Sequence, residues 1–167
     1  MEQLDYLLSP IFAHRGVLTG SFVRDCVIRH EPICKERGID VLVPFAKIRK
    51  LVACLKDLGG QVEEVDYDKQ DRVARYVVMV DDWLLDISCE YFSPPCLDVD
   101  MLSWDYYGYE FWYKVPNDYR YGHGMSIERV VSRCEQKEAV MLFQEWTDRK
   151  EGLRRVSRLS LKGWEVY

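Results

Sequence analysis

The 167-residue sequence lacks the features that mark several large classes of protein. It has no apolar run approaching the roughly 20 residues of a membrane-spanning helix, so we expect no membrane partner. Its net charge is −5, so the chain as a whole offers no positive field for nucleic acid. It also has no internal repeat, low-complexity run or linker. With 48% hydrophobic and 31% charged residues, the sequence predicts one globular domain over residues 1–167.

Cysteine and histidine are present, but not at the spacing of a metal site. None of the six cysteines belongs to a Cys-x-x-Cys motif, and there are three histidines, so no zinc site is predicted. Several cysteines lie in apolar periodic stretches, which indicates reduced and mostly buried thiols of an intracellular protein. A disulfide between Cys89 and Cys96 is the less favoured alternative. The acidic N-terminus lacks the order of a signal peptide, which also favours the cytoplasm or nucleus.

The stretch of residues 16–28 predicts a site for an anion. It consists of a short apolar run, a tight turn at Thr19-Gly20-Ser21, and a helix with Ser21 as its N-cap. The unpaired N–H groups and the positive end of the dipole at a helix N-terminus favour an anion in front of them. The pair Gly20-Ser21 is therefore interpreted as a phosphate-binding turn, with an ordinary helix cap as the alternative.

Hydrophobic periodicity predicts an α/β (α+β) fold, in which a mixed sheet is flanked by helices and followed by C-terminal helices. The expected helices cover residues 2–13, 21–28, 44–58, 126–146 and 150–161. The expected strands cover residues 39–43, 61–67, 72–80 and 83–91, with a tight Asp81-Asp82 turn before the last of them. We further expect a short strand leading into a helical turn within 97–104, pairing within 109–115, and an edge strand at 164–167.

Two acidic residues on the expected strands are candidates for catalytic and metal-binding residues. Asp40 lies near the start of one buried strand, and Asp86 lies in the middle of another. Nucleotidyl transfer needs a cradle for the triphosphate and carboxylates for divalent cations, which neutralise charge on the leaving group. The alternatives are a solvent-exposed strand-end acid for Asp40 and the polar face of a half-exposed strand for Asp86.

Four motifs together resemble the polymerase β-like nucleotidyltransferase superfamily, in particular its tRNA nucleotidyltransferase and bacterial poly(A) polymerase branch. Thr19-Gly-Ser-Phe-Val-Arg-Asp25 is similar to the Gly-Gly/Ser-x-Val-Arg-Asp signature, and Ile39-Asp-Val41 to the end of the Asp-Ile-Asp-Val strand. Leu84-Leu-Asp-Ile-Ser88 resembles the strand with the third acid, and Val99-Asp-Met-Leu-Ser-Trp-Asp105 a later Ile-Asn-Ala-Leu-Ala-Tyr-Asp motif. The C-terminal Lys162-Gly-Trp-Glu-Val resembles tails of nucleotidyltransferase-like proteins of giant DNA viruses, which implies a viral protein acting in a host cell.

The resemblance implies a nucleotidyltransferase-like core over residues 16–108 and an extension over 109–167. It assigns phosphate or nucleotide binding to Gly20, Ser21 and Arg24, and it assigns catalysis and Mg²⁺ binding to Asp40 and Asp86. The pattern is incomplete, because Gly38 stands where the first acid of the pair would be. Asp100 replaces the Asn of the later motif, and the Arg that precedes that motif is absent. The acid pair is thus predicted to hold one metal ion rather than two, unless Glu36 substitutes for the missing acid.

These departures favour a degenerate protein that binds a nucleoside triphosphate or a partner protein with weak or no transfer activity. The alternative is an active Mg²⁺-dependent enzyme that moves a nucleotide to a hydroxyl of RNA, protein or a small molecule. A third hypothesis is an antitoxin-like or assembly protein unrelated to nucleotides.

Three further features have two interpretations each. Arg24 could contact phosphate or pair locally with Asp25. The aromatic cluster of residues 104–121 could stack a base, although packing under a loop is the more usual role. The basic helix at 149–162 could bind RNA or a partner protein, with a solvated helix face as the alternative. Its cations are Arg149, Lys150, Arg154, Arg155, Arg158 and Lys162.

Overall fold

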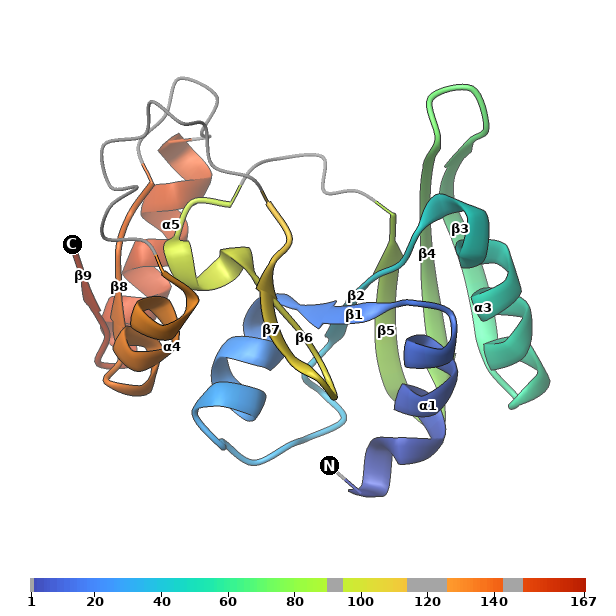
Figure 1. Cartoon of the computed structure of the whole chain (residues 1–167), viewed down its shortest axis with the longest axis horizontal. Coiled ribbons are helices and arrows are strands. Elements are labelled where there is room, and N and C mark those ends of the chain that lie inside the picture. The colour runs from blue at the N-terminus through green and yellow to red at the C-terminus, as the bar shows by residue number, and fades with distance from the viewer. Residues whose placement is uncertain (1, 90–94, 114–125, 143–148) are drawn as a thin grey trace.

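The computed structural model describes residues 2–89, 95–113, 126–142 and 149–167 and shows an α+β fold built on a seven-stranded sheet (Figure 1). The strands of this sheet lie in the order β3 (Gln61–Asp68), β4 (Val73–Val80), β5 (Trp83–Ser88), β2 (Ile39–Leu42), β1 (Val17–Thr19), β6 (Leu102–Asp105) and β7 (Gly108–Phe111). β2 and β5 are parallel, and the other neighbouring pairs are antiparallel, so the predicted mixed sheet is confirmed.

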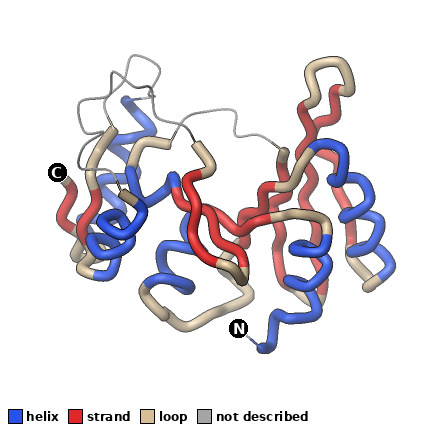
Figure 2. The backbone as a smooth tube through the Cα atoms, in the orientation of Figure 1, coloured by secondary structure: helices blue, strands red, loops and turns tan. Residues whose placement is uncertain are grey.

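The helices precede, interrupt and follow this sheet (Figure 2). They are η1 (Glu2–Leu4), α1 (Asp5–Ala13), α2 (Gly20–Phe22), η2 (Val23–Ile28), α3 (Phe45–Asp57), η3 (Asp98–Met101), α4 (Ile127–Glu135) and α5 (Arg149–Leu161). α2 continues directly into η2, which has π-helical hydrogen bonding. Strands β8 (Glu138–Ala139) and β9 (Glu165–Val166) form a second, parallel pair. None of the helices in the described ranges is long and apolar enough to cross a membrane.

The central strands separate a buried face of the sheet from a half-buried one. On β2, Ile39 and Val41 are buried, and they join one core with the apolar faces of α1 and α3, which contact each other. Side chains alternate along a strand, so Asp40 of β2 and Asp86 of β5 project from the opposite face. The acids singled out from the sequence therefore share the face that the core leaves open.

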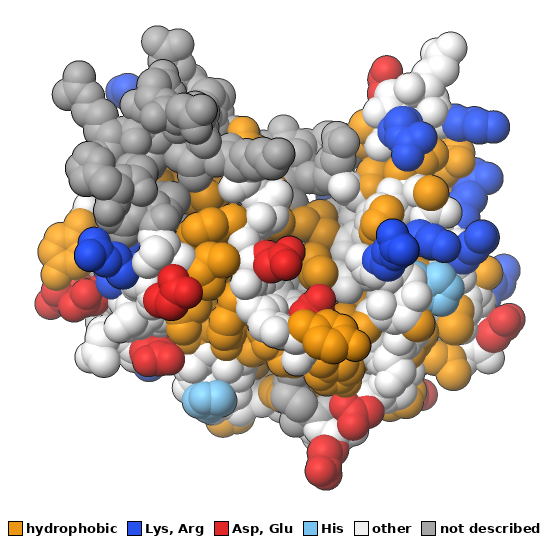
Figure 3. All heavy atoms as spheres, in the orientation of Figure 1, with side chains coloured by type: hydrophobic (Ala, Val, Ile, Leu, Met, Phe, Trp, Pro, Cys, Tyr) orange, Lys and Arg blue, Asp and Glu red, His pale blue; other side chains and the backbone are white. Residues whose placement is uncertain are grey.

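α3 has the two faces that its periodicity predicts. Ile48, Leu51 and Leu55 are fully buried against the sheet, while lysine and arginine side chains gather on the end of the molecule formed by α3 and the β3–β4 hairpin (Figure 3). On this end, the guanidinium of Arg49 lies 3.6 Å from the centre of the Tyr67 ring. This packing of a cation on an aromatic ring covers the ring with the stem of the arginine.

Several predicted boundaries are wrong. The helix after β1 begins at Gly20 with Thr19 as its N-cap, so Ser21 is not the cap. The expected helix over 126–146 ends at Glu135, because Lys137 adopts a left-handed conformation with φ 58° and the chain then enters β8. Residues 143–148 of that prediction lie outside the described residues. Within 97–104 the helical turn η3 precedes the strand β6, the reverse of the expected order.

Other local predictions are confirmed in outline. The Asp81-Asp82 turn joins β4 to β5 with both residues at positive φ, and part of 109–115 does pair, as β7 with β6. Cys89 and Cys96 are not joined in a disulfide, so the disulfide alternative is wrong. Three of the six cysteines are buried rather than most of them. Burial raises the pKa of the Cys134 thiol to about 12, which makes it unreactive near neutral pH.

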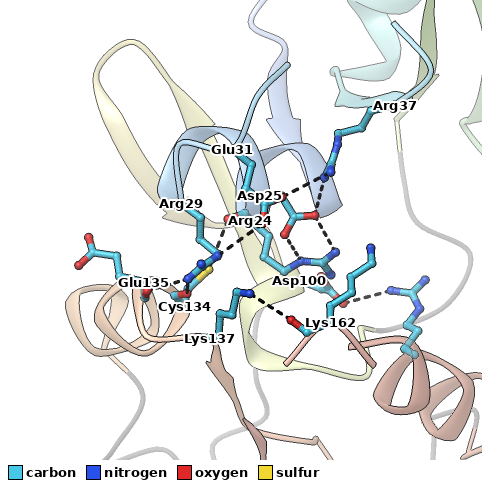
Figure 4. Close-up of polar contacts among 11 residues, drawn as sticks. Arg24, Asp25, Arg29, Glu31, Arg37, Asp100, Cys134, Glu135, Lys137 and Lys162 are labelled. Atoms are coloured by element: carbon cyan, nitrogen blue, oxygen red, sulfur yellow. Dashed lines mark hydrogen bonds and ion pairs between the residues drawn. The ribbon is translucent and has the colours of Figure 1, made fainter. Parts of the chain in front are cut away.

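The described residues of 126–142 and 149–167, here called the C-terminal unit, dock on η2. Arg29, which directly follows η2, donates to the carbonyl oxygens of Cys134 and Glu135 at the end of α4 (Figure 4). A guanidinium suits this place because the C-terminus of a helix carries partial negative charge. The ring of Trp164 lies beneath the guanidinium groups of Arg24 and Arg29, at 5.6 and 5.7 Å.

Asp98, the first residue of η3, joins the C-terminal unit to the sheet through hydrogen bonds. Its side chain is fully buried, and it accepts hydrogen bonds from the backbone N–H groups of Val99 and Val140 and from the guanidinium of Arg133. The N–H of Asp98 in turn donates to the carbonyl oxygen of Val140. Periodicity did not predict the extended conformation of residues 138–142. These hydrogen bonds stabilise it by pairing the backbone of Val140 with Asp98.

We expect Asp98→Ala to lower the free energy of unfolding by about 3 kcal/mol, because it leaves one buried and one partly buried N–H group and a guanidinium without their acceptor. Urea unfolding measures the change. Asp57→Ala, at an exposed position at the end of α3, is the matched control and should stay within about 0.5 kcal/mol of the wild type. Equal effects of the two substitutions would contradict the anchoring role of Asp98.

Candidate functional site

The turn between β1 and α2 lies directly on the carboxylate of Asp40. Thr19 opposes Asp40 in the antiparallel pairing of β1 with β2, so the next residue, Gly20, passes over that side chain. Gly20 has φ +70°, and a Cβ atom placed there would lie 2.4 Å from Asp40 Oδ2. Both the backbone conformation and the close approach therefore require glycine at this position.

Replacing Gly20 tests this contact. Gly20→Ala should cost about 2–4 kcal/mol of stability, of which about 1 kcal/mol comes from the positive φ and the rest from the clash. Gly59→Ala is the control, because Gly59 also has positive φ (+92°) but has nothing within 4 Å of its would-be Cβ. The difference between the two variants in chemical denaturation isolates the contact. A difference near zero would show that Asp40 moves aside without cost.

A cavity of about 350 Å³ opens in front of this turn. Its walls come from the start of α2 and η2, the strand β2, the chain at η3 and just after β7, and the C-terminal unit. Its lining residues are Gly20, Ser21, Arg24, Asp40, Pro95, Asp100, Trp112, Glu151, Arg155, Arg158, Leu159 and Lys162. Four of the sequence-predicted site residues, Gly20, Ser21, Arg24 and Asp40, therefore line one cavity.

Asp86, the fifth predicted residue, lies beside Asp40 rather than in the lining of the cavity. The two acids oppose each other in the parallel pairing of β2 with β5. Asp86 is held by Arg75 of β4, whose Nε and Nη2 donate to its two carboxylate oxygens at 3.0 and 2.7 Å. Glu36, the less favoured substitute for the missing acid, is exposed in the turn before β2 and does not share the strand face, so that alternative is wrong.

Asp40 has an unusual electrostatic environment. Burial, followed by the negative charges of Asp86 and Asp100, raises the pKa of Asp40 to about 6. The folded state thus binds a proton at Asp40 more tightly than the unfolded state, where the pKa is near 4. Charged Asp40 costs stability, and this cost grows as the pH rises from about 4 through 6.

Asp40→Asn should accordingly stabilise the fold by about 2–3 kcal/mol at pH 8 and by almost nothing near pH 3.5, where the carboxyl is protonated in both states. Measuring the free energy of unfolding at both pH values checks this expectation. Asp57→Asn, at an exposed position, should show little effect at either pH. A stabilisation by Asp40→Asn that did not change with pH would rule out the raised pKa as its cause.

Arg24 belongs to a chain of alternating charges at the edge of the cavity (Figure 4). Its Nε and Nη2 donate to Asp25, which also accepts from Arg37. Burial favours the neutral acid, but Arg24 and Arg37 hold the pKa of Asp25 below its ordinary value. Arg24 Nη1 also lies 3.6 Å from Asp100, and Asp100 accepts from Arg155 at 3.2 Å. Arg24 thus forms the predicted local ion pair and lines the cavity as well.

The wall formed by α5 was missed in the sequence. The basic helix was expected to meet solvent or a partner, but Arg155, Arg158 and Lys162 line the cavity opposite the Gly20-Ser21 turn. Their spacing of three and four residues places them on one side of the helix, and this is the signal that could have found them. Trp112 lines the same cavity and donates its indole N–H to the carbonyl oxygen of Asp100. Of the rest of the aromatic cluster, residues 114–121 lie outside the described residues, and Trp104 packs edge-on with Phe12.

Metal ligands are few at this site. Among the residues that the structure describes, no group of three or more His, Cys, Asp or Glu side chains lies close enough to hold an ion. Comparison with known proteins adds no assignment, because no family model matches the chain and no curated protein matches it significantly. What the site can do chemically must follow from its own residues.

Proposed function

We propose that this chain binds a nucleoside triphosphate in the cavity between the Gly20-Ser21 turn and α5, with weak or no nucleotidyl transfer. The observation that carries the proposal is the set of four cationic side chains around one cavity: Arg24, Arg155, Arg158 and Lys162. Three acids also line the cavity, but Asp100 and Glu151 pair with Arg155, and Asp40 is half-neutral near pH 6. The balance favours an anionic ligand.

The start of α2 supports the same proposal. The backbone at Gly20-Ser21 lines the cavity, and residue 20 has no side chain that could stand between it and a ligand. Phosphate oxygens are well suited to N–H groups in this position. On the other side, Arg158 and Lys162 form no ion pair within the described part of the chain. Trp112, also on the wall, offers an apolar surface for a base.

An active Mg²⁺-dependent nucleotidyltransferase is the second candidate. It is favoured by the placement of Asp40 and Asp86 side by side on parallel strands, and it is disfavoured by Gly38 and by the pairing of Asp86 with Arg75. A partner RNA or protein could also dock on the outer side of α5, where the side chain of Arg154 is 64% exposed. These candidates differ in what each predicts for pyrophosphate release and for single substitutions on the helix.

Nucleotide binding can be tested by thermal denaturation and calorimetry with ATP, CTP, GTP and UTP. A nucleotide present at 100 times its dissociation constant should add about 2.7 kcal/mol of stability. Arg158→Gln should weaken binding about tenfold, the effect of one lost charge-assisted hydrogen bond. Arg154→Gln removes the same charge from the outer side of the same helix and should leave the affinity nearly unchanged.

Each outcome separates the candidates. No stabilisation by any nucleotide at millimolar concentration would overturn the proposal. Equal losses in the Arg158 and Arg154 variants would place the ligand outside the cavity. Rapid release of pyrophosphate from the bound nucleotide, abolished by Asp40→Asn, would favour the active enzyme over the degenerate one.

A further inference from the structure

Arg75 occupies both oxygens of the carboxylate that a metal ion would need. Val77 of β4 opposes Asp86 across the antiparallel pair, and Arg75 lies two residues along on the same face. This diagonal position lets the guanidinium reach Asp86 with two parallel hydrogen bonds, at 3.0 and 2.7 Å. Hydrogen bonding to Asp86, then the charge of Asp86 and, more weakly, that of Asp40 raise the pKa of Arg75.

The remaining ligands do not fit a divalent cation. Gly38 stands two residues before Asp40, where a side chain would share the face of Asp40. A Cβ atom at Gly38 would meet only Leu84 Cδ2, at 3.9 Å, so the space for an acid is open but the carboxylate is absent. Near Asp40, the described part of the chain thus offers only the carboxylates of Asp86 and Asp100, both of which are already paired with guanidinium groups. Divalent cations that prefer oxygen need more ligands than this.

From this geometry we infer that the guanidinium of Arg75 takes the place of a divalent cation at the Asp40–Asp86 pair, so that the cavity binds its phosphate ligand without metal. Arg75 supplies a permanent positive charge next to the two carboxylates, which is the electrostatic role that a metal would otherwise fill. The inference deepens the proposed function, and only the nucleotide part of its test rests on that function.

The metal part of the test uses Mn²⁺ alone, followed by electron paramagnetic resonance of the free ion. The proteins are the full chain as wild type, Gly38→Asp, Arg75→Gln and the double variant of both. We expect binding to tighten at least about tenfold when Arg75→Gln is added to Gly38→Asp, because Asp86 is then released to join two other carboxylates. Arg72→Gln removes the same charge from the same hairpin without touching Asp86, and it should change the affinity much less.

Two results would overturn the inference from this part. One is tight Mn²⁺ binding by the wild type. The other is an equal gain from Arg72→Gln and Arg75→Gln, which would show only the effect of net charge. Arg75→Lys keeps the charge but loses the paired hydrogen bonds. Its affinity for Mn²⁺ should lie between that of the wild type and that of Arg75→Gln. Circular dichroism and thermal denaturation show that each variant is folded before its affinity is compared.

The nucleotide part compares ATP binding to the wild type in EDTA and in Mg²⁺. Affinities that agree within about threefold support a site without metal, since the difference is then below about 0.7 kcal/mol. A strict requirement for Mg²⁺ would overturn the inference while leaving the proposed function standing. If no nucleotide binds, the proposed function fails, and the Mn²⁺ series still decides whether Arg75 blocks a metal site.

Discussion

The close approach of Gly20 to Asp40 is the constraint on which the rest of the site depends. It favours the end of β1 and the start of α2 at this point, because a Cβ atom at residue 20 would lie 2.4 Å from the carboxylate oxygen of Asp40. Once the turn is placed there, the continuous helix from Gly20 to Ile28 carries Arg24 to the cavity and Arg29 to the end of α4. The helix that starts at this contact therefore forms one wall of the cavity and, through Arg29, provides one of the contacts that hold the C-terminal unit.

Guanidinium and carboxylate groups alternate at the edge of the cavity. Asp25 lies between Arg24 and Arg37, and Asp100 lies between Arg24 and Arg155. Each of these two buried carboxylates therefore lies between two guanidinium groups, which offset the cost of taking it out of water. Asp40 is the exception, since its nearest charged neighbours include two further acids, and its raised pKa is the result.

Much of the fold could be predicted because periodicity reports burial directly. α3 shows four buried apolar residues at helical spacing and cations on its other face, and the β4–β5 turn carries two residues that tolerate positive φ. The segment after α4 could not be predicted in this way. Met141 and Leu142 continue a helical spacing, but the turn at Lys137 and the hydrogen bonds offered by Asp98 and Cys96 hold the chain extended. Long-range partners of that kind leave no local signal.

The candidate site also has a part that could be predicted from the sequence and a part that could not. Gly20, Ser21 and Asp40 lie in short motifs of their own, whereas the facing of Arg155 and Arg158 toward them depends on how the C-terminal unit docks.

Because the C-terminal unit forms part of the cavity, the cavity forms late in the synthesis of the chain. A ribosome that has synthesised the chain as far as β7 has produced the whole seven-stranded sheet, and domains tend to fold from the N-terminal end during synthesis. Yet five of the twelve residues around the cavity come from positions 151–162. The nascent sheet would display Asp40 and the Gly20-Ser21 turn to solvent, and the pocket would form only after residues 151–162 have left the ribosome.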